Sequence, residues 1–406
     1  MSVASGTSGV PRPLVSPEER STLATGLRLA VFSDTWLPQV NGVTRTLDRL
    51  VQAIRARGGD ARAYTTRDPG ALEDAGIVRY PSRPFWAYPQ LQIARPDAAW
   101  AVRELTAFRP TLVHAATPFG IGLGGRSAAR RLGIPLVTSY HTSLSAYAKF
   151  YHLGALSAPG WAFLRWFHNS GCRTYCPTRA IERELAEHDF AGTRIWSRGI
   201  DADRFSPSFR SAPLRAELGI SNDTFLVTYI GRIALEKGLD TLVKGMREVV
   251  ARAGTRKIAF ALAGDGPYDE ACRREAPPGT RFVGMISGDR LSAFYASGDL
   301  FVFPSVTDTF GNVLLEAMAS ALPILGAGSG PTRELLDDGR GALFPAADAS
   351  AMAAQVLALA DDAARRDRMR EAGLAYARAR SWDAIFDALV LDYRDAVSES
   401  ARSPAA

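Results

Sequence analysis

The sequence predicts an α/β protein with two doubly wound, Rossmann-like domains, each built on a parallel sheet flanked by helices. Short apolar stretches typical of buried strands alternate with helical patterns almost from end to end. The alternation is interrupted once, by a polar stretch with two prolines at 198–220. The length of 406 residues suits two to three domains. These three observations predict the class.

The first series of elements predicts an N-terminal domain over 27–200. Its expected strands are 27–33, 61–66, 111–116, 134–140, 172–178 and 193–197. Helical patterns at 42–58 and 126–133 separate some of them, as crossovers between parallel strands do. The preceding 1–26 is rich in Ser, Thr, Gly and Pro and lacks the apolar core of a signal peptide, so we expect a disordered tail.

The second series predicts a C-terminal domain over 201–381. Its expected strands are 224–230, 257–264, 281–284, 299–305 and 322–328. The last helical pattern, at about 382–397, is expected to pack back onto the first domain. Ligands of doubly wound sheets bind at the carboxyl ends of the strands, so a cleft between two facing domains is the expected active site.

Composition limits the classes of function. The chain is 47% hydrophobic and 22% charged, as in ordinary soluble proteins, and no apolar stretch approaches the ~18 residues of a membrane-spanning helix. Three cysteines, without Cys or His at zinc spacing, favour a reducing cytoplasm and no structural metal. The net charge of +6 suits phosphate-bearing ligands or an anionic membrane. No basic run or RNA-binding signature points to nucleic acid.

Two basic residues follow the first strand of the second domain. The strand ends at Gly231, and Arg232 and Lys237 lie in the loop before the next helix. Arginine offers bidentate contacts and lysine a point charge, which suits a diphosphate. The spacing does not match a nucleoside-triphosphate P-loop. The alternative interpretation is that both are surface charges of a βα loop.

Two carboxylates surround a helix start in "TDTFGNVLLEAMA" (307–319). Asp308 follows a buried strand, the helix begins near Gly311 or Asn312, and Glu316 lies about one turn into it. Free backbone N–H groups at a helix start attract anions or hydroxyl lone pairs. Carboxylates repel a bare phosphate but accept hydrogen bonds from hydroxyls, so they suit a hexose and a ribose. The alternative is that Asp308 caps the helix and Glu316 pairs with an arginine.

Two residues of the first domain are further candidates. Gly42 stands at a helix start, where its missing side chain lets backbone approach a phosphate, although turn geometry alone also explains a glycine. His141 lies just past the strand 134–140, at the expected cleft edge, although a lone histidine is more often structural.

Three further patterns have competing interpretations. "FGIGLGG" (119–125) formally fits a dinucleotide fingerprint, but 134–160 holds no acidic residue for the ribose, so its glycines are expected to allow close packing. Asp201 and Asp203 form an Asp-x-Asp in the junction, where we expect no metal. The basic–aromatic segment 147–171 suits an anionic membrane surface or a core helix with an aromatic face.

The chain resembles the GT-B glycosyltransferases and, within them, glycosyltransferase family 4. The stretches that carry the resemblance are "GRIALEKGLD", "AGDGP", "FVGMIS" and "TDTFGNVLLEAMASALP". It covers about 27–397 and is most specific in the C-terminal half. The family's usual Glu-x7-Glu pair begins here with Asp308. This feature, with "SDTWLPQVNGV" and "TSYHTSLSAYAKFY", resembles bacterial GDP-mannose-dependent α-mannosyltransferases and glycolipid synthases such as sulfoquinovosyltransferases.

The resemblance implies roles for individual residues. Arg232 and Lys237, after Gly231, would hold the diphosphate, with Gly42 closing from the other domain. Glu316 would take the ribose hydroxyls. Asp308 and the backbone at Phe310, Gly311 and Asn312 would contact the hexose, and Val313 beside them would complete this part of the donor site. Met285 and Ile286 would contact the base. His141 would contact the sugar from the N-terminal domain. Of these, His141, Arg232, Lys237 and Asp308 would be catalytic.

We therefore expect a cytoplasmic, retaining, metal-independent hexosyltransferase without a cofactor, peripheral on the inner face of the membrane. The expected donor is GDP-mannose, with UDP-glucose, UDP-galactose or UDP-sulfoquinovose as alternatives, and the acceptor is a lipid or glycan. Two alternatives from other classes remain: a dinucleotide-dependent oxidoreductase, and a non-catalytic binder of nucleotide sugars or nucleic acid.

Overall fold

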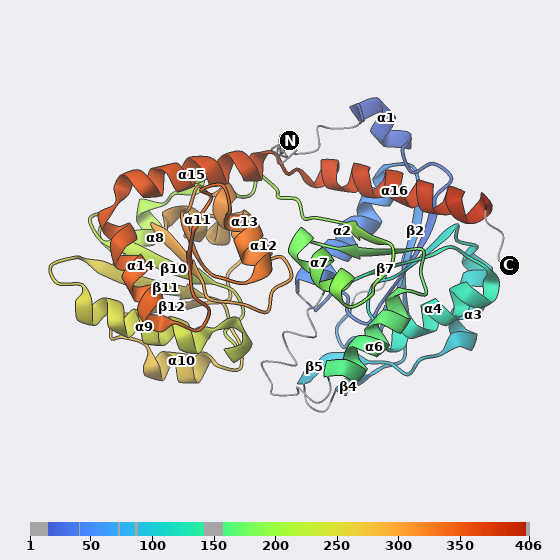
Figure 1. The fold of residues 1–406 in the computed structure, drawn as a ribbon, viewed down its shortest axis with the longest axis horizontal. Coiled ribbons are helices and arrows are strands. Elements are labelled where there is room, and N and C mark those ends of the chain that lie inside the picture. Colours follow the sequence, from blue (N-terminus) through green and yellow to red (C-terminus); the bar gives the residue numbers. More distant parts are fainter. Residues whose placement is uncertain (1–14, 40, 72–73, 86–87, 142–156, 403–406) are drawn as a thin grey trace, which may run out of the picture. The chain divides into compact units, whose positions relative to one another are not determined.

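The computed structural model describes residues 15–39, 41–71, 74–85, 88–141 and 157–402. These residues fall into two compact units (Figure 1). The first contains the described residues up to Ser197 and from Asp383 onward. The second runs from Arg198 to Trp382.

The first unit is built on a parallel sheet with the strand order β3-β2-β1-β6-β7-β8-β9. Its strands are β1 (Arg28–Ser33), β2 (Asp60–Thr66), β3 (Ile77–Tyr80), β6 (Leu112–Ala115), β7 (Leu136–Ser139), β8 (Arg173–Cys176) and β9 (Thr193–Ile195). The short β4 (Arg83–Phe85) and β5 (Tyr88–Ile93) form a separate antiparallel pair. The sequence did not reveal β3, because its four residues are only half-buried and lack a continuous apolar run.

Helices connect these strands and supply the rest of the core. They are α2 (Gly42–Ala56), α3 (Ala98–Phe108), α4 (Gly120–Leu132), α6 (Ser157–His168), α7 (Arg179–Glu187) and, from the far end of the chain, α16 (Trp382–Arg402). The helix α16 contacts this unit through buried polar groups as well as apolar ones. The hydroxyl of Tyr393 lies 2.7 Å from Nδ1 of His114 on β6.

The second unit has a six-stranded parallel sheet in the order β12-β11-β10-β13-β14-β15. Its strands are β10 (Phe225–Ile230), β11 (Ile258–Ala263), β12 (Arg281–Gly284), β13 (Leu300–Phe303), β14 (Ile324–Ala327) and β15 (Ala342–Phe344). The chain order reverses between β10 and β13 here, and between β1 and β6 in the first sheet. Both sheets are therefore doubly wound, as the sequence predicts.

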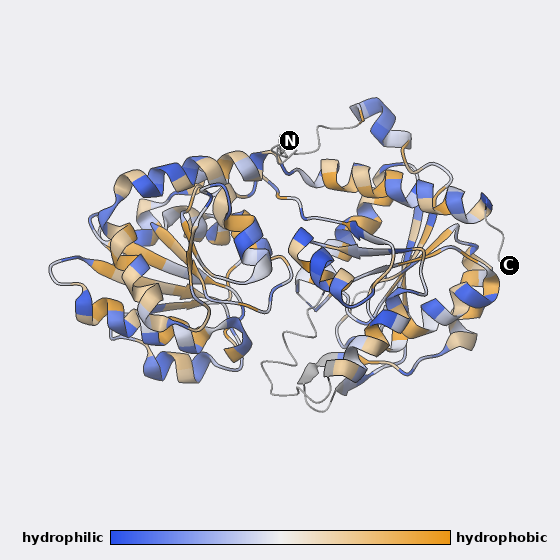
Figure 2. Ribbon diagram, in the orientation of Figure 1, coloured by the Kyte–Doolittle hydropathy of each residue, from blue (hydrophilic) through white to orange (hydrophobic). Residues whose placement is uncertain are grey.

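Helices of the second unit build an apolar layer on each face of its sheet. The helices are α8 (Ala212–Glu217), α9 (Leu239–Arg252), α10 (Asp269–Glu275), α11 (Gly288–Ser297), α12 (Asn312–Ala319), α13 (Gly330–Leu336), α14 (Ala349–Asp361) and α15 (Ala363–Arg378), with the 3-10 turns η2 (Pro207–Phe209) and η3 (Leu235–Lys237). Figure 2 shows the strands as largely hydrophobic and the helices as mixed, with hydrophilic residues concentrated on them. This pattern is typical of a sheet buried on both sides.

The expectation of a disordered tail over 1–26 is wrong for the part that the structure describes. Residues Pro17–Thr22 form α1, which a capping box between Ser16 and Glu19 begins. The following Leu23 and Ala24 are buried. The sequence did not predict this short helix, because the segment is mostly polar. Its few apolar residues follow the helix instead of forming a periodic pattern within it.

A buried ion-pair cluster links α1 and the end of α2 to α16. Asp387 on α16 is fully buried and accepts from Nε of Arg57 at 2.8 Å and from Nε of Arg20 at 2.9 Å. Arg57 also lies 2.9 Å from Asp383. A buried arginine and a buried carboxylate each need a partner, so the three elements depend on one another.

We predict that Asp387→Ala destabilises the first unit by about 3 kcal/mol, because it leaves Arg57 buried with one fewer opposite charge. The matched control is Asp60→Ala, since Asp60 and Arg28 form a 3.5 Å pair with exposed fractions of 48% and 42%. The control is expected to cost less than about 1 kcal/mol. Denaturant unfolding followed by tryptophan fluorescence reports on this unit, because six of the seven tryptophans belong to it. Equal losses in the two variants would contradict the structural role of the cluster.

Candidate active site

The C-terminal residues that the sequence singled out follow the carboxyl ends of three strands of the second sheet. Arg232 follows β10, Met285 and Ile286 follow β12, and Asp308 follows β13. In a parallel sheet these ends share one edge, and β10 and β13 flank the point where strand order reverses. That point is where doubly wound sheets bind ligands.

Lys237 and Asp308 form an ion pair at this point. Nζ of Lys237, the last residue of η3, donates to Oδ1 of Asp308 at 2.7 Å. The two side chains are 20% and 27% exposed, so the pair is accessible yet mostly shielded from water. Burial alone would raise the pKa of Asp308, but the charge and hydrogen bond of Lys237 outweigh it and lower that pKa.

A second pair holds the other cation of this loop. Nη1 of Arg232 lies 3.3 Å from Oε1 of Glu236, which is four residues later in the same loop, and the Glu236 side chain is 5% exposed. The hydroxyl of Thr307 donates to the backbone carbonyl of Glu236 at 3.0 Å, which ties the loop after β10 to the loop after β13. Sequence reasoning missed Glu236. Its position four residues after Arg232 was not a usable signal, because that spacing predicts a pair only along a helix and Arg232 lies in a loop.

The helix α12 begins beside these pairs. Gly311 directly before it has φ of 83°, a left-handed conformation that favours glycine. The N-cap residue of α12 is Gly311, which has no side chain to cap the helix, and Asp308 is paired with Lys237, contrary to the alternative interpretation that Asp308 is the cap. Phe310 is buried, while Asn312 and Val313 are partly exposed. The N–H groups of this first turn suit oxygen acceptors.

Glu316, predicted to bind ribose hydroxyls, lies on the same helix. It is half-buried, and its Oε2 accepts a hydrogen bond from the hydroxyl of Tyr295 on α11 at 2.7 Å. Tyr295 itself is fully buried. A buried donor thus holds one oxygen of this carboxylate. The contact could not be predicted from the sequence, because it joins two different helices.

The predicted residues of the first unit also follow strand ends or begin helices. His141 lies two residues past β7, its Nε2 is 2.7 Å from Oγ of Ser139, and its ring meets Trp196 edge-on at 5.5 Å. Gly42 is the exposed first residue of α2, which Asn41 caps by accepting from the amide of Thr44 at 2.9 Å. The expected cleft between the domains stays a prediction.

The glycine-rich start of α4 has a structural role. Asp34, directly after β1, accepts from the amides of Ile121 at 2.8 Å and Gly122 at 3.3 Å. Its burial raises the pKa of this carboxyl, which the hydrogen bonds partly offset. A Cβ at Gly125 would lie 2.3 Å from the Phe32 ring of β1. The protein's own carboxylate thus occupies the position that a dinucleotide phosphate would need, which confirms the close-packing interpretation.

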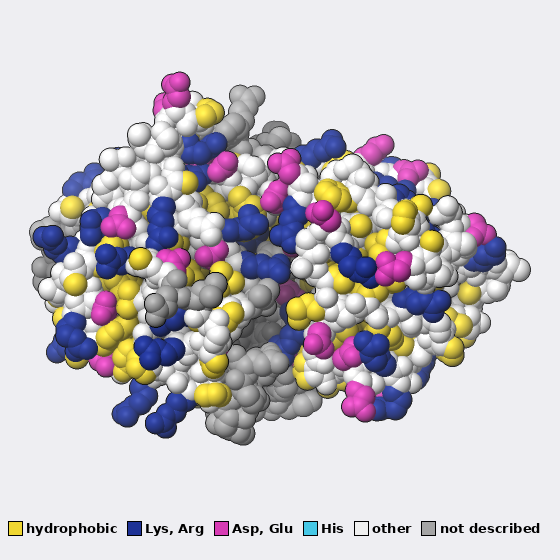
Figure 3. Space-filling model, turned by 180° about the vertical axis from the view of Figure 1, so that it is seen from behind, with side chains coloured by type: hydrophobic (Ala, Val, Ile, Leu, Met, Phe, Trp, Pro, Cys, Tyr) yellow, Lys and Arg dark blue, Asp and Glu magenta, His cyan; other side chains and the backbone are white. Residues whose placement is uncertain are grey.

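Other possible sites carry less chemistry. Among the residues that the structure describes, no cluster of three or more His, Cys, Asp or Glu side chains is arranged to hold a metal ion. Within the described ranges, no helix combines the length and apolar character needed to cross a membrane. On the face drawn in Figure 3, Lys and Arg side chains are interspersed with Asp and Glu side chains over both units.

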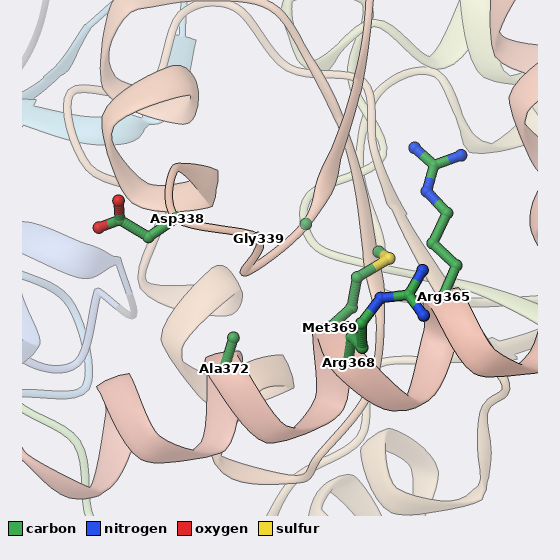
Figure 4. Close-up of a pocket in the computed structure, with 7 residues that line it drawn as sticks. Asp338, Gly339, Arg365, Arg368, Met369 and Ala372 are labelled. Atoms are coloured by element: carbon green, nitrogen blue, oxygen red, sulfur yellow. The ribbon is translucent and has the colours of Figure 1, made fainter.

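A pocket of about 490 Å³ lies elsewhere in the second unit, between α15 and the loop before β15 (Figure 4). Arg365, Arg368 and Met369 line it from α15, and Asp338 and Gly339 belong to the loop on its other side. The loop precedes β15, so this pocket opens at the amino end of that strand. It is therefore separate from the carboxyl edge that carries the ion pairs.

We predict that Lys237→Met raises the pKa of Asp308 above 3.8, the ordinary value, because burial then acts without an opposing cation. In the wild type that pKa lies below 3.8. Carbon-13 NMR titration of the carboxyl groups, assigned by comparison with Asp308→Asn, measures both values. Lys244→Met is the control, because Lys244 pairs with Asp240 at 3.8 Å on an exposed helix face. An unchanged Asp308 titration in Lys237→Met would show that the two groups are not paired in solution.

Comparisons with known proteins agree with this geometry. The model of Glycosyltransferase Family 4 matches 40–204, and the model of Glycosyl transferases group 1 matches 224–362. The chain is 31% identical over 390 residues to the GDP-mannose-dependent alpha-mannosyltransferase of Corynebacterium glutamicum, covering 93% of this chain and 91% of that protein. It is 30% identical to the sulfoquinovosyl transferase SQD2 of Arabidopsis thaliana, covering 93% of this chain and 74% of that protein.

Solved structures agree on the fold. Sucrose-phosphate synthase from Thermosynechococcus elongatus superposes with a TM-score of 0.74 at 21% identity, covering 92% of this chain and all (100%) of that chain. HepE of Anabaena, solved in complex with UDP-glucose, gives 0.69 at 18% identity, covering 91% and 99%. Two parallel-sheet units with these neighbours confirm the expected architecture. The chain belongs to glycosyltransferase family 4 and is a hexosyltransferase with the GT-B fold.

Proposed function

We propose that this protein is a retaining glycosyltransferase that moves a hexose from a nucleotide-diphosphate sugar to a lipid or glycan acceptor. The observation that carries the proposal is the set of two cation–carboxylate pairs at the reversal point of the second sheet, next to the uncapped start of α12. Cations, acceptors and backbone donors within one edge match a ligand that joins a diphosphate to hydroxyl-rich rings.

Each predicted residue has a role in this proposal. Arg232 and Lys237 bind the diphosphate, and Asp308 accepts from hexose hydroxyls once Lys237 turns to the phosphates. Glu316, held by Tyr295, accepts from the ribose. The contacts that complete the donor site are the backbone at Gly231, Phe310, Gly311, Asn312 and Val313, the base-binding segment Met285–Ile286, and, from the first unit, Gly42 and His141.

The proposed reaction proceeds on one face of the sugar. The bond between the anomeric carbon and the phosphate oxygen breaks, and a bond to the acceptor oxygen forms on the same side. The departing phosphate oxygen takes the acceptor's proton. That proton and the two cations together offset the negative charge of the departing diphosphate. In this proposal Arg232 and Lys237 supply the positive charge, and no metal ion is required.

GDP-mannose is our proposed donor. It is supported by mannosyltransferase relatives at 31% identity in three bacteria. The alternative, a UDP-sugar-dependent glycolipid synthase, is supported by the sulfoquinovosyl transferase and by an alpha-monoglucosyldiacylglycerol synthase of Streptococcus pneumoniae at 28% identity. The two proposals both describe transfer of a hexose. They differ in the base of the nucleotide donor and in the sugar that it carries.

We predict that Lys237→Ala and Glu316→Ala each lower release of nucleoside diphosphate from the donor by about 100-fold or more, while circular dichroism stays unchanged. Removing Lys237 takes away charge stabilisation of the leaving group, and removing Glu316 loosens the ribose. Turnover is measured with EDTA present, where we expect the wild type to remain active. Lys244→Ala, an exposed lysine on α9, is the matched control and should keep wild-type turnover.

Binding of GDP, UDP and NAD, followed by thermal shift, separates the alternatives in the same preparations. We expect GDP to stabilise the wild type and to stabilise Lys237→Ala much less. Stabilisation by UDP alone would select the glycolipid-synthase alternative. Stabilisation by NAD alone, wild-type turnover in Lys237→Ala, or loss of all turnover in EDTA would each overturn the corresponding part of the proposal.

We further propose that the enzyme works in the cytoplasm on an anionic membrane surface, through a patch on α6 and α4. Trp166 and Phe163 are 51% and 38% exposed, with ring centroids 5.8 Å apart. The guanidinium of Arg126 lies 3.7 Å from the centre of the Trp166 ring, and the exposed Arg130 follows one turn later. Exposed aromatic rings beside arginines suit the boundary between lipid headgroups and acyl chains.

The helix α6 also agrees in part with the alternative interpretation of this segment as a core helix. Its opposite side buries Leu164, Phe167 and His168. The remainder of the predicted basic–aromatic segment, 142–156, lies outside the described residues. Accordingly, α6 divides its aromatic residues between the core and the surface.

We predict that wild-type protein floats with vesicles containing anionic phosphatidylglycerol and less with neutral phosphatidylcholine. The double variant Phe163→Ala/Trp166→Ala should lose about tenfold or more of the bound fraction, because it removes two apolar side chains from the interface. Val250→Ala, which truncates a 50% exposed residue on α9, is the control. Equal flotation of the double variant and the wild type would contradict docking through α6.

A further inference from the structure

A chain of three hydrogen bonds leads from His141 into the core of the first unit. Nε2 of His141 lies 2.7 Å from Oγ of Ser139, and the same Oγ lies 2.8 Å from Nε2 of His114 on the neighbouring strand. Nδ1 of His114 lies 2.7 Å from the hydroxyl of Tyr393 on α16. Ser139 is 2% exposed, and His114 and Tyr393 are fully buried. Water therefore has little access to these three side chains. Their hydroxyl and ring N–H groups must donate to other members of the chain.

The direction of these bonds follows from the buried end. Among the described residues, Nδ1 of His114 is the one polar partner that the Tyr393 hydroxyl contacts. Burial raises the pKa of Tyr393 far above its usual value, so the hydroxyl keeps its hydrogen and donates it to Nδ1. Burial also lowers the pKa of His114 to about 3, so this ring is neutral at physiological pH and carries one hydrogen. That hydrogen is then on Nε2.

The remaining two bonds are determined in turn. Nε2–H of His114 donates to Oγ of Ser139, whose own hydrogen is then directed to Nε2 of His141. Nε2 of a neutral His141 is therefore an acceptor, and its hydrogen is on Nδ1. A tyrosine on the last helix thus sets the tautomer of a histidine at the carboxyl end of β7.

We propose that Ser139, His114 and Tyr393 are positioning residues for His141: they fix the orientation of its ring and hold it as the Nδ1–H tautomer. This inference rests on the proposed function for its consequence, which is that His141 meets the sugar as a hydrogen-bond donor through Nδ1. It also gives α16 a role in the first unit beyond packing. A fixed tautomer removes the need to reorganise the ring when substrate binds.

Another buried histidine provides an internal comparison. His168 on α6 is 1% exposed, and its Nδ1 lies 2.8 Å from Oγ1 of Thr138, the residue before Ser139 on β7. Thr138 continues to Thr174 at 3.1 Å, within the core. This second chain does not include His141. Thr138→Val therefore perturbs a buried histidine on a helix that contacts the same strand, without altering the chain to His141.

The test is nitrogen-15 NMR of histidine-labelled protein at pH 8, without ligand, because a chain with five histidines gives few signals. We expect His141 in the wild type as the Nδ1–H tautomer and His114 as Nε2–H. Tyr393→Phe removes one distant hydroxyl and should convert His141 to a mixture of tautomers, as should Ser139→Ala. Thr138→Val should shift His168 and leave His141 unchanged.

An Nε2–H tautomer of His141 in the wild type, or a His141 signal that Tyr393→Phe leaves unchanged, would overturn the proposal. Turnover provides the second readout. We expect Tyr393→Phe to lower kcat by about tenfold with little change in donor KM, since ring placement matters most in the transition state. A change in KM alone would also contradict the positioning role. The NMR result needs no substrate, so it stands or fails independently of the proposed reaction.

Discussion

The ion pair between Lys237 and Asp308 is the contact on which the site in the second unit depends. It joins the loops after β10 and β13 at the one place in that sheet where the strand order reverses. Its partial exposure matters, because a fully buried pair would be too costly to open and a fully exposed one would be screened by water. A diphosphate can compete for Lys237 without the loop losing its shape, since Thr307 and Glu236 hold the two loops together independently.

The two units use the same topology for different purposes. In the first sheet, the reversal between β1 and β6 is filled by Asp34, whose carboxylate satisfies the amino end of α4. In the second sheet, the corresponding region carries cations paired with carboxylates, and the N-cap residue of α12 is a glycine without a capping side chain. A helix start that is already satisfied has little to offer a phosphate, whereas an uncapped one beside lysine and arginine does. This difference is the reason why we propose the diphosphate contacts in the second unit.

Much of the fold was predictable because its signal is local. The expected strand 299–305, for example, contains the continuous apolar run Leu300–Phe303, and that run is the strand β13 in the structure. The half-buried β3 and the short α1 lack such runs and were missed. The positions of Arg232, Lys237 and Asp308 in loops after strand ends were also predictable, because each loop follows a recognisable strand. Glu316 was predictable because it lies in the helix that follows the last of these loops.

Their partners were not predictable, because those contacts connect residues far apart in the sequence. Tyr295 meets Glu316 across two helices, and Tyr393 reaches His114 from 279 positions away. Single-sequence patterns carry period and composition, but not which side chains face one another across a layer. A histidine inside the apolar run "TLVHAA" was the one available sign of a buried polar chain, since buried histidines need partners.

The most direct test of the central claim is a crystal structure of the enzyme with GDP-mannose, or with GDP where the donor is hydrolysed. We expect the diphosphate within hydrogen-bonding distance of Nζ of Lys237 and of the Arg232 guanidinium, with Asp308 released to a sugar hydroxyl. A nucleotide bound away from the β10–β13 edge, with the Lys237–Asp308 pair still closed, would contradict the account.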